Sequence, residues 1–240
     1  MKKIKLENFI SAQTEYSRRK IFELFREKKV LINGNIVNNL FQEINPNKDV
    51  VKVAGKDLTG LVKYYYYKFN KPNGIISTMD DPKNRKSLTA YLEKAPKSIF
   101  PIGRLDRNTT GLLLFTNNGE FANRISHPRY KLEKKYKVTL NKTITKRHFE
   151  RLTAGFFLDD GPVVFHKVEL ESEQELIVWI SEGRNRIIRR SFHLLEYEVI
   201  KLKRLAIGPI ELANLSEGKL SSLSNSEIRA VFNQLQLKIK

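Results

Sequence analysis

The sequence contains no cysteine, which excludes disulfides and thiolate metal sites and suits a reducing compartment. No apolar run reaches the ~18 residues that a membrane-spanning helix needs. Residues 1–6 alternate Lys with Ile and Leu and lack the apolar core of a signal peptide. We therefore expect a soluble, cytoplasmic protein with no membrane partner.

Several catalytic motifs are missing as well. The chain has no Gly-x-x-x-x-Gly-Lys phosphate loop, no His-Glu-x-x-His zinc pair and no Gly-x-Ser-x-Gly nucleophile elbow. Its histidines are scattered, and none has a ligand-like neighbour: His127, His148, His166 and His193. A nuclease would need a metal-binding carboxylate cluster or paired histidines, and the sequence shows neither. We expect no metal site.

Positive charge is what the sequence has in excess. Forty-four Lys and Arg oppose 26 Asp and Glu, which gives a formal net charge of +18. Such a balance indicates a polyanionic partner, because neutralising phosphates releases counterions and favours binding. An ordinary basic surface is the alternative. An anionic membrane is disfavoured, because no basic amphipathic helix dominates the chain. Nucleic acid is the favoured partner.

Residues 1–60 have the pattern of a small domain with two helices followed by short strands. Ser17 is placed to cap the second helix, and Asn33-Gly34 is a hairpin turn signal. The segment resembles the alpha-L RNA-binding module named after a ribosomal small-subunit protein. The resemblance rests on four stretches, residues 6–10, 17–19, 30–34 and 49–51. A glycine-containing link at residues 54–62 follows it.

Arg18 and Arg19 begin the second expected helix, where the helix dipole disfavours cations. A solvated first turn is one interpretation of this pair. A phosphate partner would offset the unfavourable placement, so the resemblance implies that both arginines bind RNA.

Residues 61–240 are expected to form a larger, strand-rich domain. Strands are predicted near residue 75 and at residues 64–69, 99–102, 112–116, 136–140, 163–170, 176–180 and 199–207. Helices are predicted at residues 87–94, 120–125, 145–154, 185–195 and 226–237. Because strands outnumber helices and many connections are short, we predict an α+β fold with a mixed, mainly antiparallel sheet flanked by helices.

A polar loop bracketed by glycines, residues 103–111, leads into an apolar run. Its single carboxylate is Asp106, with Arg104 and Arg107 close in sequence. Loops at the ends of buried strands often present catalytic groups. An Asp that bonds its own loop amides is the structural alternative.

Two further stretches combine basic residues with other groups. On a helix, Arg186, Arg189, Arg190 and His193 would share one face, at spacings of three and four. Such a cluster fits a clamp for phosphate or carboxylate, and a solvated cationic face is the alternative. Tyr136 lies within a basic segment, where an aromatic ring can stack an RNA base or simply pack in a strand.

These stretches occur together in the order found in one family. They are residues 71–74, 103–106, 110–114, 133–138, 182–190 and 202–209. Over nearly its whole length, the chain resembles the ribosomal RNA pseudouridine synthases of the RsuA and RluB kind. Two positions depart from the family pattern, because Ile187 stands where Gln is expected and Ser191 where Met is expected. These departures put the packing of this helix and one RNA contact in doubt.

The resemblance implies isomerisation of a uridine within RNA, with no cofactor or metal. It implies Asp106 as the essential carboxylate, for which attack on the sugar, attack on the base and proton removal are open first steps. Tyr136 would contact the target base, and Arg189 would pair with Asp106. Arg104 would help to displace the target nucleotide from its stack, and Leu202 would line the base pocket.

Ribosomal RNA is the implied substrate, and Lys71, Arg186 and Arg190 would bind it. Residues 122–128 are more similar to the large-subunit enzymes, so large-subunit rRNA is preferred and small-subunit rRNA is the alternative. A non-catalytic RNA-binding or ribosome-assembly protein is a further alternative, although it gives no reason for the Asp106 loop. We expect a monomer that acts on free rRNA or on ribosomal subunit assembly intermediates.

Overall fold

The computed structural model describes residues 3–79, 81–83 and 85–236. The chain divides into two compact units. Unit 1 comprises Met1–Tyr66, Lys94–Phe100 and Phe115–Ala122, and unit 2 comprises Tyr67–Glu93, Pro101–Leu114 and Asn123–Lys240. Within the described residues, no helix is long and apolar enough to cross a membrane.

Unit 1 begins with two helices, α1 (Leu6–Gln13) and α2 (Arg18–Arg26). A four-stranded antiparallel sheet follows in the order β3-β2-β5-β6, while β1 pairs with β4. The strand bounds are β1 Ile4–Lys5, β2 Val30–Ile32, β3 Asn35–Ile36, β4 Glu43–Ile44, β5 Val51–Val53 and β6 Lys56–Leu58. The expected cap of α2 is confirmed, because the Ser17 side chain accepts a hydrogen bond from the amide of Lys20 at 3.1 Å.

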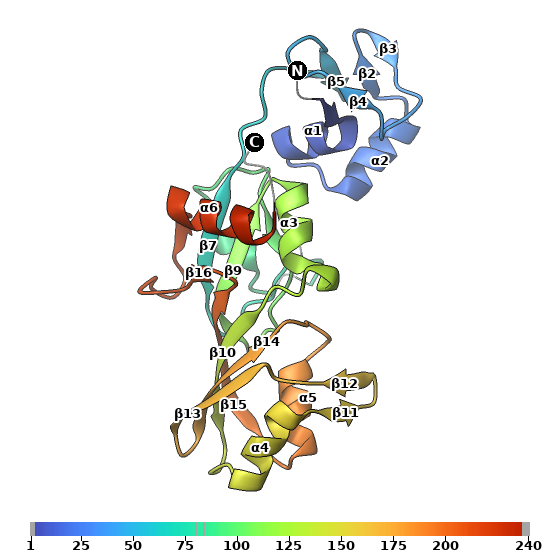
Figure 1. Ribbon diagram of the computed structural model, residues 1–240. Coiled ribbons are helices and arrows are strands. Elements are labelled where there is room, and N and C mark those ends of the chain that lie inside the picture. The colour runs from blue at the N-terminus through green and yellow to red at the C-terminus, as the bar shows by residue number, and fades with distance from the viewer. Residues whose placement is uncertain (1–2, 80, 84, 237–240) are drawn as a thin grey trace. The chain divides into compact units, whose positions relative to one another are not determined.

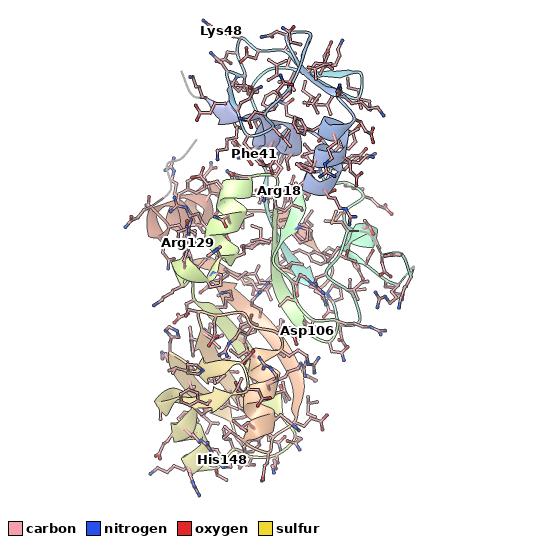
Figure 2. The ribbon with its side chains drawn as sticks, turned by 90° about the vertical axis from the view of Figure 1, so that its right-hand side faces the viewer. Arg18, Phe41, Lys48, Asp106, Arg129 and His148 are labelled. Carbon is pink, nitrogen blue, oxygen red and sulfur yellow. The ribbon has the colours of Figure 1, made fainter. Side chains whose placement is uncertain are left out.

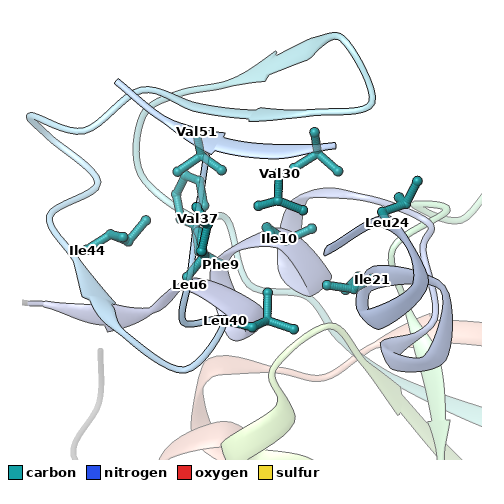
Figure 3. Packing of buried hydrophobic residues seen from close by; sticks show 11 residues of the cluster. Leu6, Phe9, Ile10, Ile21, Leu24, Val30, Val37, Leu40, Ile44 and Val51 are labelled. Carbon is teal, nitrogen blue, oxygen red and sulfur yellow. The ribbon is translucent and has the colours of Figure 1, made fainter. Parts of the chain in front are cut away.

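An apolar cluster holds the helices of unit 1 to its strands (Figure 3). The members shown lie on both helices, on the strands and on the connections between them: Leu6, Phe9, Ile10, Ile21, Leu24, Val30, Val37, Leu40, Ile44, Val51 and Val53. All of them are at most 5% exposed, so this small segment has an apolar core. The segment expected to be a link contains β6, which pairs with β5 and is therefore part of the sheet.

Unit 2 is built on a larger mixed sheet. Its strands run in the order β13-β14-β10-β15-β9-β7-β17, with β16 paired to β15 and β8 paired to β9. The bounds are β7 Tyr66–Lys71, β8 Phe100–Ile102, β9 Thr110–Thr116, β10 Lys134–Leu140, β13 Lys167–Ser172, β14 Glu175–Ile180, β15 Val199–Ile207, β16 Ile210–Glu211 and β17 Leu220–Ser222. The pairings of β10 with β14 and β15 are antiparallel, and that of β9 with β15 is parallel. The predicted α+β fold with a mixed, mainly antiparallel sheet is confirmed.

Helices and one hairpin flank this sheet. The helices are α3 Gly119–Ser126, α4 Lys146–Ala154, α5 Ile187–Leu194 and α6 Asn225–Gln234, and the 3-10 turns are η1 Leu88–Tyr91 and η2 Pro128–Tyr130. The hairpin consists of β11 Phe156–Leu158 and β12 Gly161–Val163. Figure 1 shows the hairpin beside α5, and these two elements are in contact.

Some predicted elements differ from the structure. The helix predicted at residues 87–94 is only the short η1 turn, and residue 75 lies in no strand. The strand predicted at residues 163–170 is divided into β12 and β13. The helix predicted at residues 226–237 ends at Gln234, and residue 237 lies outside the described residues.

The parallel contact between β9 and β15 brings the two strands unusually close. Gly111 has a φ of +95°, and a Cβ added there would lie 2.3 Å from the carbonyl oxygen of Arg204. Only glycine fits such a contact without a shift of the backbone. This contact brings the start of β9, and the loop before it, next to the middle of β15.

Candidate active site

Asp106, labelled in Figure 2, lies in the loop of residues 103–109 that leads into β9. The ammonium of Lys71 holds this loop through its backbone. It donates hydrogen bonds to the carbonyl oxygens of Arg107 at 3.3 Å and Thr109 at 2.9 Å. A third bond, of 3.0 Å, goes to the carbonyl of the residue that follows the lysine.

This placement corrects the RNA contact expected of Lys71. The side chain is 0% exposed, and all three of its hydrogen bonds go to backbone carbonyls. Burial lowers the pKa of the Lys71 ammonium to about 8, and the negative charges of Asp106 and Glu217 oppose that change. Lys71 therefore supports the loop from inside and does not reach a ligand at the surface.

Other side chains hold two further carbonyls of the loop. The Ser77 hydroxyl donates to the carbonyl of Leu105 at 2.7 Å and accepts from its amide at 3.1 Å. The guanidinium of Arg189 donates to the carbonyl of Asn108 at 2.9 Å. The backbone on both sides of Asp106 is thus fixed, while the carboxylate itself is half-buried and lines a pocket.

The pocket beside Asp106 has a volume of about 340 Å³. The loop before β9, the strands β10 and β15, and the segment that enters α5 form its walls. Its lining consists of Arg104, Leu105, Asp106, Thr109, Tyr136, Leu202 and residues 183–188. Five of the residues expected to form the site therefore meet in one place: Arg104, Asp106, Tyr136, Arg186 and Leu202.

The charge of this pocket suits an anionic ligand. Arg104 and Arg186 line it beside the single carboxylate of Asp106, while Arg184, which also lines it, is paired with Glu182 and Asp160. In the described part of the chain, no group of three or more His, Cys, Asp or Glu side chains could hold a metal ion. The pocket therefore combines cationic side chains with the largely buried side chains of Tyr136 and Leu202.

Tyr136 lies on β10 and is 8% exposed. Its hydroxyl lies 3.5 Å from Nη1 of Arg204, and Nε of Arg204 donates to the carbonyl of Leu112 at 2.7 Å. Arg204 is 4% exposed, and the sequence analysis missed it. Strand alternation was the available signal, because residue 204 shares a face with the pocket residue Leu202.

The basic cluster predicted around α5 also comes together. A second hollow, of about 300 Å³, is lined by Arg186, Arg189, Arg190, His193, Tyr197, Glu198 and Val199. The helix starts at Ile187, two residues later than predicted, so Arg186 is its N-cap with a φ of +47°. The four basic residues thus meet although one of them lies outside the helix.

The expected pairing of Arg189 with Asp106 is not formed within the described residues. The guanidinium of Arg189 instead donates to the carbonyls of Val199 at 2.6 Å and Asn108 at 2.9 Å. Burial, followed by the charge of Arg186, lowers the pKa of Arg189, and the charge of Asp106 opposes this. Arg189 is thus linked to the Asp106 loop by its hydrogen bond to Asn108 and to Asp106 itself only by charge.

The remaining predicted arginines have other surroundings. The guanidinium of Arg190 binds the carboxylate of Asp160 at 2.7 Å and the carbonyl of Asn185 at 2.9 Å. Arg18 and Arg19 belong to unit 1 and stand on the exposed first turn of α2. Binding of RNA by these three arginines stays a prediction.

Both departures from the family pattern lie inside the protein. Ile187 is 5% exposed and Ser191 is 0% exposed. Among the described residues, the hydroxyl of Ser191 finds no hydrogen-bond partner. Both positions therefore belong to the packing of α5, and Ile187 also borders the pocket beside Asp106.

Comparisons with known proteins find similar sequences and a similar structure. The family model described as RNA pseudouridylate synthase matches residues 65–194. An RNA pseudouridine synthase of Aquifex aeolicus is 37% identical over 99% of this chain and 97% of its own length. Ribosomal large subunit pseudouridine synthase B of Bacillus subtilis is 36% identical over 94% of each chain. A crystal structure of a pseudouridylate synthase covers 94% of this chain and 98% of its own, with 30% identity and a TM-score of 0.67.

Proposed function

We propose, because this chain belongs to the RNA pseudouridylate synthase family, that it converts a specific uridine of ribosomal RNA to pseudouridine with Asp106 as its essential carboxylate. Membership makes the chain an isomerase that acts on RNA. The observation that supports the residue assignment is the pocket of about 340 Å³ that joins Asp106 to Tyr136 and Leu202. Asp106 is the only carboxylate among the residues that line this pocket.

The proposed reaction needs no oxidant or reductant. The bond from C1′ of the ribose to N1 of uracil breaks, the base turns, and C1′ joins C5. The hydrogen on C5 leaves as a proton, and N1 takes one up. Asp106 initiates this exchange, while Tyr136 and Leu202 hold the base between them.

The target base must leave its stack before it can enter the pocket, and this costs a few kcal/mol. Arg104 is exposed at the rim, next to Asp106 in the loop. We propose that Arg104 helps to displace the target nucleotide from its stack. Arg186 is also exposed, and in the described part of the chain it has no ion pair, so it is available to a phosphate.

Large-subunit rRNA is the substrate that we favour. The relative from Bacillus subtilis bears the name of a large-subunit synthase, and it is similar over 94% of this chain. The net charge of +18 supports a polyanionic partner of this size. Small-subunit rRNA is the alternative substrate. We place the reaction in the cytoplasm, where a chain without cysteine is at no disadvantage.

Residues 1–60 are proposed as an RNA-binding domain in front of a catalytic domain of residues 61–240. The side chains of Arg18 and Arg19 are 65% and 93% exposed, and each has an acidic neighbour within 4 Å that a phosphate can replace. We propose that the protein acts as a monomer, on free rRNA or on subunit assembly intermediates.

Modification of rRNA transcripts tests the proposal. Purified protein is incubated with large-subunit and small-subunit rRNA lacking modifications, and pseudouridine is mapped by carbodiimide-dependent stops of primer extension. One strong stop in large-subunit rRNA, absent with Asp106→Asn, is the expected result. A stop only in small-subunit rRNA would move the target to the other subunit. No stop in either RNA would contradict the rRNA assignment.

A further inference from the structure

The β11–β12 hairpin lies outside the lining of the pocket, yet it is tied to the pocket wall by one carboxylate. Asp160 stands in the two-residue turn between β11 and β12. Its Oδ1 lies 2.8 Å from Nη1 of Arg184, and its Oδ2 lies 2.7 Å from Nη2 of Arg190. A single carboxylate therefore bridges two guanidinium groups, one from the segment that lines the pocket and one from α5 just after that segment.

All three nitrogens of the Arg184 guanidinium form hydrogen bonds within the protein. Its Nε and Nη2 form a forked pair with the carboxylate of Glu182, at 2.6 and 3.1 Å. Nη1 donates to the carbonyl of Gly161 at 3.2 Å, and Nη2 donates to that of Pro162 at 2.5 Å. Arg184 thus docks the hairpin and has little capacity left for an RNA phosphate.

Arg190, on α5, binds the other oxygen of the same carboxylate. While one edge of its guanidinium binds Asp160, its Nε donates to the carbonyl of Asn185 at 2.9 Å. The next residue, Arg186, has a left-handed φ of +47° that a non-glycine residue keeps only when its surroundings hold it. Residues 183–186, which have no regular structure of their own, are therefore held through two arginines that share Asp160.

We propose that Asp160 is a positioning residue of the proposed pseudouridine synthase reaction. By binding Arg184 and Arg190 together, it holds residues 183–188 in the arrangement that forms the pocket wall opposite Asp106. Without its charge the two guanidinium groups face each other with no shared counterion, and the wall loosens. The assignment rests on the proposed function, since it explains how that same pocket keeps its shape.

A second reading of Asp160 makes an opposite prediction for binding. If its carboxylate only repelled RNA phosphates, its removal would tighten binding and leave the chemical step unchanged. The adjacent Asp159 supplies a matched control, because it is an exposed carboxylate in the same turn that reaches Arg190 through its charge and, among the described residues, forms no ion pair. Asp159→Asn and Asp160→Asn change the net charge equally.

The test measures single-turnover pseudouridine formation at saturating rRNA fragment, together with the Kd of that fragment and the thermal unfolding of each variant. Asp160→Asn is expected to lower the saturating rate by on the order of tenfold to a hundredfold, as a displaced catalytic wall does, with a Kd unchanged or tighter. Asp159→Asn should keep the wild-type rate. Asp160→Glu keeps the charge but places it one methylene further out, so its rate should fall between the two.

Equal saturating rates for Asp160→Asn and Asp159→Asn would overturn the proposal, as would a loss confined to Kd. If Asp160→Asn does not fold, the glutamate variant decides, and a wild-type rate for it would overturn the proposal. The wild-type protein is measured in parallel on the same fragment. A failure of the proposed function appears there as no product in any sample, which differs from a failure of the Asp160 assignment.

Discussion

The ammonium of Lys71 donates a hydrogen bond to the carbonyl of Thr109 at 2.9 Å, and this bond ties the end of β7 to the loop that carries Asp106. The same ammonium also binds the carbonyl of Arg107, so it holds the loop just after Asp106. A buried lysine thus holds the backbone of the loop that presents the carboxylate to the pocket. Its contribution can be separated from that of Asp106 itself.

Replacing Asp106 by Asn should abolish pseudouridine formation and leave RNA affinity within about twofold of the wild type. The amide has the shape of the carboxylate, and the loop is held through its backbone, but an amide is a poor nucleophile and a poor base. Single-turnover assays and filter binding on one rRNA fragment measure both properties. Normal product formation by Asp106→Asn would remove it from the role of essential carboxylate.

Lys71→Met should destabilise the protein by about 3 kcal/mol, because three backbone carbonyls, two of them in buried hydrogen bonds, lose their donor. The saturating rate should fall as well, since the Asp106 loop is no longer held. Chemical denaturation and single-turnover assays measure the two effects. Lys52→Met, at an exposed position of β5, is the control and should change neither. If Lys71→Met had the stability and the rate of the wild type, Lys71 would not support the loop.

The pH dependence should follow the Lys71 ammonium, whose pKa is lowered to about 8 by burial. Above that pH, the neutral amine has two N–H groups for three carbonyls, so the rate should decline as the pH rises through about 8. The contribution of Lys71 to the unfolding free energy changes in the opposite direction, and rises as the pH rises. Between about 8 and the ordinary lysine pKa of 10.5 the unfolded chain binds more protons, so this group makes the unfolding free energy rise with pH. If the rate of Lys71→Met declines at alkaline pH in the same way, the decline belongs to the titration of another group.

Arg189→Ala should lower the rate more than the affinity, because its hydrogen bonds go to the carbonyls of Asn108 and Val199 and not to a surface ligand. Losing two charge-assisted hydrogen bonds should also cost about 2 to 4 kcal/mol of unfolding free energy. Arg189→Lys, which keeps the charge but not the forked geometry, should recover part of both. A folded alanine variant with a normal single-turnover rate would contradict the positioning of Asp106 by Arg189.

The double variant Arg18→Ala and Arg19→Ala tests the proposed RNA-binding domain without removing it. If both side chains neutralise phosphates, the slope of log affinity against log salt should become shallower by about 1.5, since each contact contributes about 0.7 to 0.9. The saturating rate should stay unchanged. Lys28→Ala together with Lys48→Ala removes the same charge elsewhere in unit 1 and serves as the comparison. Identical slopes for the two double variants would mean that α2 makes no special contact with RNA.

Local signals in the sequence were sufficient for much of the secondary structure. Ser17 caps α2 as predicted, and β15 has the predicted bounds of residues 199–207. Caps and strand alternation depend on residues close together in the chain, so a sequence can be read for them directly. The prediction of a helix at residues 87–94 is wrong, because only the short η1 turn forms there. Tertiary packing overrides local helix propensity at such positions.

The order of motifs along the chain was sufficient to identify the family and Asp106 as the candidate carboxylate. The sequence by itself also determined which donors the site contains, namely Lys71, Arg189 and Arg190. Only the tertiary structure decided what these donors bind. Lys71 is buried against the Asp106 loop, Arg189 binds carbonyls, and Arg190 shares Asp160 with a second arginine. The physical reason is that an ammonium or guanidinium binds whichever acceptors the packing brings within about 3 Å. Some of those acceptors, such as Thr109 for Lys71 and Asp160 for Arg190, lie 30 or more residues away in the chain.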